Sequence, residues 1–234
     1  VSNSGIITTP KGETILAAGE RVRLVDTGTP GVTVEITGSA NRATNLGDIT
    51  AEAGRIGIAG ALVANSGKLN ASSVVEDDGR IFLRATKKIE LADTSKISAN
   101  GLAGGSITTI TREKGQISGE LVARGEISAQ SNTPNGRGGF VETSAAAVKI
   151  ENDFIVNTGG GRWLIDPTDF TIGAGSGTQT ISGIGATTLQ TALGSGSITI
   201  QTDASPGGNG DIFVNAGVAW SSVHSLTLEA HRII

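Results

Sequence analysis

Two carboxylates in one short string are the residues of this chain best placed to do chemistry. Asp166 and Asp169 lie three positions apart in Asp-Pro-Thr-Asp, between Trp163 and Phe170. Such a pair could act as a general acid and base, or hold a metal ion, if a cleft set their two pKa values apart. Asp-Pro and Thr-Asp are also strong turn formers. We therefore expect a structural turn, with Trp163 and Phe170 packed against the end of a structural repeat.

A second acidic cluster, Glu76, Asp77 and Asp78, lies in the loop expected at residues 72–78. Some β-helical polysaccharide lyases gather acidic calcium ligands on one face, and this cluster could belong to such a site. Calcium takes six to eight oxygen ligands, and the corresponding loops at 100–104 and 130–138 contain no Asp or Glu. We therefore expect a solvated loop and no metal site.

Three further patterns give weaker signals. Gly207-Gly-Asn-Gly-Asp211 is similar to the calcium-binding nonapeptide of β-roll proteins, but it is one residue short and does not repeat. His224 and His231 have no Cys and no third ligand candidate nearby, so they make a poor zinc site. Asn70-Ala-Ser72 is an acceptable N-glycosylation sequon. No nucleophile elbow stands out, so the sequence predicts no catalytic residue, no metal and no cofactor.

The elements that must position these residues are short strands in a recurring pattern. It reads apolar–x–Ala, a loop, and then Gly–x–apolar–x–apolar (or Thr). The first half begins at Ile49, Leu69, Ile97 and Ile127, and the second at Gly54, Gly79, Gly105, Gly139 and Gly210. Apolar and polar residues alternate within each half, which indicates strands. Recurrence with an imperfect period is typical of a stacked repeat.

Three short strands in each unit of about 20–30 residues predict one rung of a parallel β-helix, with rungs about 4.8 Å apart. Apolar pairs such as Val22/Leu24 and Leu226/Leu228 are assigned to a further strand of the rung. Corner glycines are expected to supply backbone angles that other residues resist. We expect five residues to point inward and to stack between rungs: Ile56, Ile81, Ile107, Val141 and Ile212.

The loops of the pattern vary in length while the strands do not. They are residues 52–53, 72–78, 100–104, 130–138 and 203–209. Insertions confined to one position of a repeat lie on one face of the stack. A β-sandwich is disfavoured, because Asn-Gly turns occur only inside these loops. A propeller is disfavoured by the scarcity of aromatic residues.

Residues 159–195 interrupt the pattern. Leu189 and Leu193 lie at helical spacing and Gly194 is a C-terminal stop signal, so we expect a short helix near 186–193 that covers one edge of the stack. The predicted organisation is therefore in three parts. Regular rungs occupy 1–161, an irregular interruption packed on the same solenoid occupies 162–195, and rungs resume at 196–234.

Composition sets further bounds. The chain has 234 residues, 35 of them Gly, with no Cys, no Met and a formal net charge of −4. The negative charge argues against non-specific nucleic-acid binding. No apolar run approaches 18 residues, so no membrane-spanning segment is expected. Both ends of the sequence fall within the repeat pattern, and neither resembles the polar cap that the end of a solenoid needs. We therefore expect a segment of a longer exported chain.

The string Trp163-Leu-Ile-Asp-Pro-Thr-Asp-Phe170 resembles a signature of the two-partner-secretion exoproteins. This family includes the filamentous-haemagglutinin-like adhesins and the haem–haemopexin utilisation proteins of Gram-negative bacteria. The stretches from Asn45 to Gly67 and from Gly208 to Ala230 also resemble its repeats, so the resemblance covers nearly the whole chain. It implies a right-handed β-helix, and a structural role for the signature residues Trp163, Asp166, Pro167, Asp169 and Phe170.

The resemblance also carries expectations about export and modification. It implies a product that is secreted or held on the bacterial surface. An outer-membrane transporter is implied as a partner for the full-length chain only, and the secretion domain that engages it would precede this segment. Some members carry glucose on asparagine, which makes Asn70 a candidate glycosylation site.

These observations favour an adhesin that attaches to, or captures, a host or matrix glycan or protein, with no reaction catalysed. Binding residues often lie on loops held by a rigid scaffold, so we expect the contact on the loop face. The candidate residues there are Glu76, Asp77, Asp78, Asn132, Asn135 and Arg137. Two alternatives stay open: a carbohydrate-active β-helix enzyme of the polysaccharide-lyase type, and a passive stalk that presents a distal toxin or binding tip.

Overall fold

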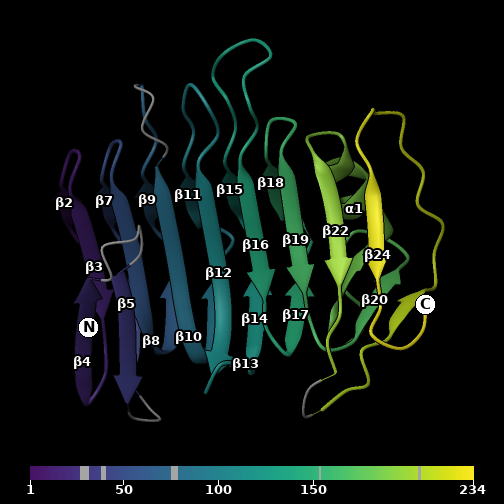
Figure 1. Cartoon of the computed structure of the whole chain (residues 1–234), viewed down its shortest axis with the longest axis horizontal. Helices are drawn as coiled ribbons and strands as arrows, with labels where there is room; N and C mark the ends of the chain where they lie inside the picture. Colours follow the sequence, from purple (N-terminus) through teal and green to yellow (C-terminus); the bar gives the residue numbers. More distant parts are fainter. Residues whose placement is uncertain (27–31, 38–40, 75–78, 153, 205–206) are drawn as a thin grey trace.

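The computed structural model describes residues 1–26, 32–37, 41–74, 79–152, 154–204 and 207–234. Short parallel strands follow one another as rungs along the long axis of the molecule, from the amino-terminal to the carboxyl-terminal end (Figure 1). The connection between parallel strands is right-handed in nearly all proteins. The chain is a right-handed parallel β-helix with a short helix, as the sequence predicted.

Each rung has three faces. The first contains β3 (Glu13–Ala17), the first halves of β8 (Arg55–Asn65) and β10 (Arg80–Leu91), β12 (Ser106–Glu113), β16 (Phe140–Ser144), β19 (Arg162–Asp166), β22 (Ser197–Gln201) and β24 (Leu226–Glu229). The second contains β1 (Ser2–Asn3), β6 (Arg42–Asn45), the second halves of β8 and β10, β14 (Glu120–Ala123), β17 (Ala147–Ile150), β21 (Gly183–Gly185), β20 (Phe170–Gly173) and β23 (Ile212–Val214).

The third face is a separate six-stranded sheet. It contains β2 (Ile6–Thr8), β7 (Asp48–Thr50), β9 (Lys68–Asn70), β11 (Lys96–Ser98), β15 (Glu126–Ser128) and β18 (Ile155–Asn157). β8 and β10 are long because each bends from the first face to the second, and the register with its neighbour shifts between Ala85 and Lys88. A short β13 (Gln116–Ile117) turns back antiparallel to the end of β12.

The core is a set of apolar columns in the middle of the three faces. The five residues predicted to point inward are all buried, with at most 1% of their surface exposed: Ile56, Ile81, Ile107, Val141 and Ile212. The first four also pair in successive rungs. The prediction of an inward orientation is therefore confirmed.

The assignment of Ile212 to the same column is wrong. It pairs with Phe170 on the second face. The column of Val141 continues instead through Trp163 and Ile198. Trp163 lies two positions after Gly161, and Ile198 lies two positions after Gly196. Both therefore have the Gly–x–apolar spacing of the sequence repeat.

Glycines at the corner between the third and first faces are required by close packing of the rungs. A Cβ atom on Gly105 would lie 2.2 Å from the carbonyl oxygen of Gly79, and one on Gly139 would lie 2.5 Å from that of Gly105. Gly54, Gly79, Gly105 and Gly139 do not have positive φ angles. The expected reason, an unusual backbone angle, is therefore wrong at these four positions.

One segment departs from the rung pattern near the amino-terminal end. β4 (Arg21–Asp26) and β5 (Val32–Thr37) pair antiparallel as a separate two-stranded sheet. The prediction that Val22 and Leu24 belong to a rung strand is therefore wrong. Alternation of apolar residues has the same period in a hairpin as in a rung strand, so periodicity alone does not separate the two.

The helix α1 (Ala186–Leu193) matches the predicted range, and its C-cap is Gly194. It follows β21 on the second face, precedes β22 on the first and contacts β18, so it takes the place of a third-face strand. Leu189 and Leu193 lie on the inward side of the helix and are fully buried. Large aromatic side chains are buried in the interior as well.

Trp163 is the largest of these interior residues. Its ring is 1% exposed and meets Phe154 edge to face, with 5.9 Å between ring centroids. Its indole N–H donates a hydrogen bond of 3.1 Å to Oγ1 of Thr143. Phe170 is also fully buried.

Candidate binding groove at the loop edge

The connections from the third face to the first leave the stack along one edge, at the top of Figure 1. The predicted loops at 72–78, 100–104 and 130–138 all lie in these connections, as expected; residues 75–78 lie outside the described part of the chain. The loop at 203–209 instead connects β22 on the first face to β23 on the second, so its assignment to the same edge is wrong. In both kinds of connection a short alternating strand is followed by a loop and then by a glycine, so the sequence pattern does not distinguish them.

Polar side chains at the end of the third-face strands form a row of hydrogen bonds across four rungs. We call Asn70, Ser72, Ser98, Asn100, Ser128, Gln130 and Asn157 the polar row. Its bonds include Ser98 Oγ to Asn70 Oδ1 (2.9 Å), Ser128 Oγ to Asn100 Oδ1 (2.8 Å) and Asn157 Nδ2 to Gln130 Oε1 (2.8 Å). Stacked rungs place these groups at the spacing of neighbouring strands, within reach of one another. The row therefore fixes polar side chains in position along the loop edge.

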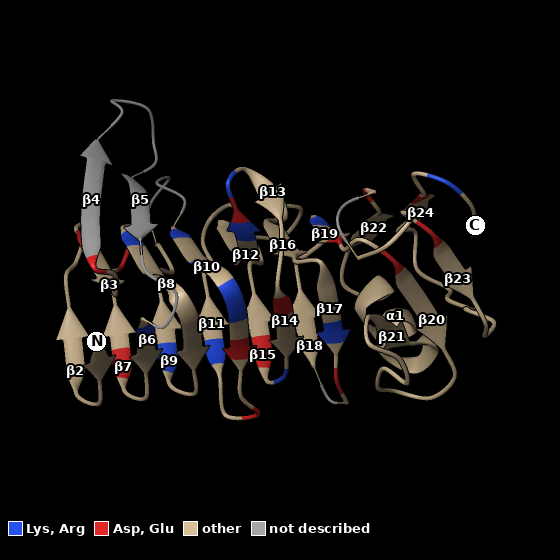
Figure 2. Ribbon diagram, turned by 90° about the horizontal axis from the view of Figure 1, so that it is seen from below, with Lys and Arg blue, Asp and Glu red and all other residues tan. Residues whose placement is uncertain are grey.

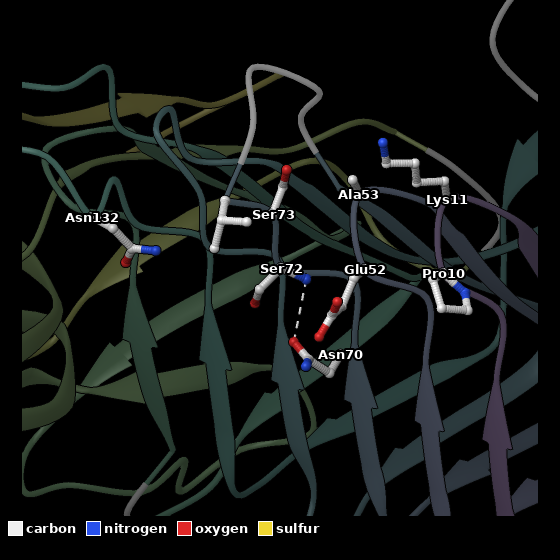
Figure 3. Close-up of a pocket in the computed structure, with 9 residues that line it drawn as sticks. Pro10, Lys11, Glu52, Ala53, Asn70, Ser72, Ser73 and Asn132 are labelled. Atoms are coloured by element: carbon white, nitrogen blue, oxygen red, sulfur yellow. Dashed lines mark hydrogen bonds between the residues drawn. The ribbon is translucent and has the colours of Figure 1, made fainter.

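At one end of the polar row the loops surround a pocket with a cavity volume of about 230 Å³ (Figure 3). Its polar lining includes Glu52, Asn70, Ser72 and Asn132. The amide oxygen of Asn70 accepts hydrogen bonds from the Ser72 backbone N–H (3.2 Å) and from Ser98 Oγ (2.9 Å). Because the oxygen already accepts two hydrogen bonds, the amide nitrogen is the group of Asn70 that can donate to a ligand.

Asn132 reaches the pocket from the longest of the loops. Its backbone N–H donates to the carbonyl oxygen of Gly101 at 2.6 Å, which ties the loop to its neighbour. Its side chain is exposed. Glu52 is exposed as well, and lies two positions after the end of β7.

The structure brings together only part of the predicted contact residues. Asn132 and the sequon residue Asn70 line one pocket. Asn135 is exposed with a φ angle of +58°, and Arg137 is exposed, but neither lines it. The three acidic residues Glu76, Asp77 and Asp78 lie outside the described residues.

Sequence reasoning missed Glu52, Pro10 and Lys11 as pocket residues. They occupy the same loop position as Asn132 but in the first two rungs, where the loops are short. Their common place in the repeat was the signal that could have identified them.

The carboxylates of the signature string face different surroundings. Oδ1 of Asp169 accepts three backbone N–H groups, from Asn209 (3.0 Å), Gly210 (2.9 Å) and Asp211 (2.8 Å). This carboxylate ties the connection between β22 and β23 to the start of β20. The preceding Pro167 accepts a backbone hydrogen bond from Asp203 at 3.3 Å.

Asp166 is buried, with 8% of its surface exposed, and its Oδ1 has no hydrogen-bond partner in the part of the chain that the structure describes. Burial raises its pKa to about 6, the negative charges of Asp203 and Glu142 add to this effect, and Arg112 opposes it. It therefore differs from Asp169 in both burial and bonding.

The two histidines make separate contacts near the carboxyl-terminal end. His224 Nδ1 lies 2.8 Å from the carbonyl oxygen of Leu193, at the end of α1. The His231 backbone N–H donates to Thr202 Oγ1 at 3.3 Å. Across the described ranges, no group of three or more His, Cys, Asp or Glu residues is arranged to hold a metal ion. No helix in those ranges is long and apolar enough to cross a membrane.

Charge on the third face is mixed. Asp48, Lys68, Lys96 and Glu126 form one row in successive rungs, visible in Figure 2 as a red segment on β7, blue segments on β9 and β11, and a red segment on β15. On the second face, Glu120 bridges Lys88 (3.3 Å) and Lys149 (2.6 Å). These rows do not build a single-sign surface.

The fold and the loop edge define a class: a parallel β-helical scaffold whose polar groove lies where its loops project. Within that class, the chain is similar in fold to the HMW1 secretion domain from Haemophilus influenzae, with a TM-score of 0.68 and 23% sequence identity. The match covers 97% of this chain, which spans 60% of the length of that domain. No protein-family model and no curated protein sequence matches the chain.

Proposed function

We propose that the chain is a rigid segment of a large bacterial exoprotein that is exported by two-partner secretion, and that it attaches to a host or matrix glycan or protein. The observation that carries the attachment proposal is the polar row ending in a pocket at the loop edge. A rigid β-helix holds such loops in fixed positions, and loops on a rigid scaffold are a common place for binding residues.

The export proposal is supported by two observations. The string from Trp163 to Phe170 resembles the signature of two-partner-secretion exoproteins, and the fold is similar to that of a secretion domain. The full-length protein would then be secreted or held on the surface of a Gram-negative cell. It should appear in the medium or on the cell surface only when its outer-membrane transporter is produced with it. Accumulation outside the cell without any such transporter would contradict this route.

The sequence had placed the secretion domain before this segment. The solved domain that matches in fold is itself a secretion domain and aligns with 97% of the chain. This favours the proposal that the chain includes part of the secretion domain. A full-length protein that lacks residues 1–161 should then accumulate inside the cell even when its transporter is present.

Attachment can be tested on the purified chain with immobilised glycans and matrix proteins. Shortening residues 130–138 to a Gly-containing turn should preserve the circular dichroism spectrum and weaken binding. Lys114→Gly changes an exposed turn away from this edge and serves as the control. A trimmed protein that folds normally and binds as well as the wild type would remove this loop from the contact.

The proposal assigns no reaction to the chain. A polysaccharide lyase would release unsaturated products from acidic polysaccharides in the presence of calcium, and we expect none. A passive stalk would fold normally and bind none of the immobilised ligands. The two alternatives therefore give results that differ from those of an attachment segment.

A further inference from the structure

We propose that the pocket at the end of the polar row binds one uncharged sugar ring. This inference rests on the proposed attachment function and names the class of ligand. It is carried by three features of the pocket: its size, the presence of both apolar and polar groups in its lining, and the pre-positioned amide of Asn70.

The size of the pocket fits a single ring. Pockets for drug-sized ligands have volumes of about 300–1,000 Å³. The cavity volume here is about 230 Å³, which is below that range. An extended oligosaccharide would therefore place one unit in the pocket, with the remainder running along the polar row.

The apolar part of the lining suits the carbon–hydrogen faces of a sugar. It is formed by Pro10, Ala53 and Val74, and the side chain of Val74 is 88% exposed. Burying such surface against a ring of C–H groups is favourable, by about 25 cal/mol for each Å² removed from water.

The polar part supplies both donors and acceptors. The carboxylate of Glu52 accepts hydrogen bonds only, whereas the amides of Asn70 and Asn132 offer N–H donors. Each hydroxyl group of a sugar both donates and accepts, so adjacent hydroxyls can donate to the carboxylate and accept from an amide. The lining combines both kinds of group at one site (Figure 3).

Hydrogen bonds within the polar row fix the orientation of the Asn70 amide in the absence of a ligand. Its amide oxygen already accepts from Ser72 and Ser98, which fixes the plane of the amide. A group that is held in its binding orientation loses less conformational entropy when the ligand binds. The bonds within the row therefore hold the Asn70 side chain, which lines the pocket, in one orientation before binding.

The charges of the pocket give an acidic sugar no advantage over a neutral one. Glu52 and Lys11 contribute one negative and one positive charge to the lining, and both side chains are exposed, so solvent and salt screen them alike. A sialylated or sulfated glycan should therefore bind no more tightly than the neutral glycan with the same core.

The test uses the purified chain and the methyl glycosides of neutral hexoses and N-acetylhexosamines. Titration followed by ¹H–¹⁵N NMR should shift the side-chain amide signals of Asn70 and Asn132, with a dissociation constant of about 1 mM for the best ring. Glu52→Gln, Asn70→Ala and Asn132→Ala should each weaken binding about tenfold. Thr108→Ala changes an outward side chain on the first face, outside the pocket lining and the polar row, and should leave binding within about twofold of the wild type.

The outcomes separate this inference from the function on which it rests. If the chain binds immobilised glycans or proteins but the three pocket variants bind as well as the wild type, the pocket is not the site and attachment stands. Preference for sialylated or sulfated glycans would overturn the assignment of a neutral ring. If neither the glycosides nor any immobilised ligand binds, both the inference and the attachment function are wrong.

Discussion

Replacing Asp166 with asparagine should stabilise the protein at neutral pH while leaving its stability near pH 4 almost unchanged. The carboxyl group is 8% exposed, and its Oδ1 is without a hydrogen-bond partner among the described residues. Burial, and then the charges of Asp203 and Glu142, raise its pKa from 3.8 to about 6. Asparagine has nearly the same shape as the protonated acid and carries no charge at any pH.

The magnitude follows from the shift in pKa between the unfolded and folded states. An acid with a raised pKa keeps its proton in the native state over a range of pH in which the unfolded chain has lost it. The free energy of unfolding therefore falls as the pH rises from about 4 to about 6, and stays low above that. At 1.36 kcal/mol per pKa unit, a shift of about two units lowers the stability by about 3 kcal/mol.

Urea unfolding of both proteins, followed by circular dichroism between about pH 4 and pH 8, measures this effect. The difference in unfolding free energy between Asp166→Asn and the wild type should rise from near zero at the acidic end to about 2–3 kcal/mol at the neutral end. Asp93→Asn makes the same chemical change at an exposed side chain and serves as the control. A difference that does not change with pH would refute the reasoning, as would a variant less stable than the wild type at neutral pH.

Three further substitutions probe other parts of the stack. Ile81→Asp places an unpaired charge in the core and should lower the unfolding free energy by several kcal/mol, whereas Thr108→Asp, on an outward position, should melt within a few degrees of the wild type. Asp169→Ala removes the acceptor of three backbone N–H groups and should make residues 207–211 sensitive to limited proteolysis under conditions in which the wild type resists. Asn45→Ala interrupts a buried row of amides with neighbours at 2.8 and 2.9 Å, and should cost about 1–3 kcal/mol in urea unfolding; an unchanged midpoint would show that the row contributes little.

The β-helix could be predicted because its signals are local. Alternation within Gly79-Arg-Ile-Phe-Leu specifies a strand with Ile81 and Leu83 inward, and both are buried. The helix at 186–193 could be predicted for the same reason, since Leu189 and Leu193 are separated by about one helical turn. Neither inference required knowledge of which rungs are neighbours.

The predictions that failed concern which strands pair with one another. Ile212 follows a corner glycine like the other four core residues, but it lies on the second face because β23 pairs with β20. The segment containing Val22 alternates like a rung strand, yet it pairs antiparallel with β5. In both cases the local pattern is compatible with two partners, and the choice is made by long-range pairing that a single sequence does not reveal.

The pocket lies beyond sequence reasoning for a related reason. Glu52, Asn70 and Asn132 are separated by 18 and 62 residues along the chain, and only the register of the rungs brings them to one edge. The sequence did single out Asn70 and Asn132, but for separate reasons and without placing them together.

The same architecture separates the residues that keep the fold from those that can vary. At the loop edge, glycines such as Gly105 and Gly139 are fixed because a Cβ would collide with the backbone of a neighbouring turn. The loops between these strands carry no such constraint, because strand pairing continues on either side of them. Each rung contacts mainly its neighbours, so a change in loop length leaves the register of the stack intact. A binding groove at this edge can therefore change its shape and its ligand while the β-helix beneath it stays the same.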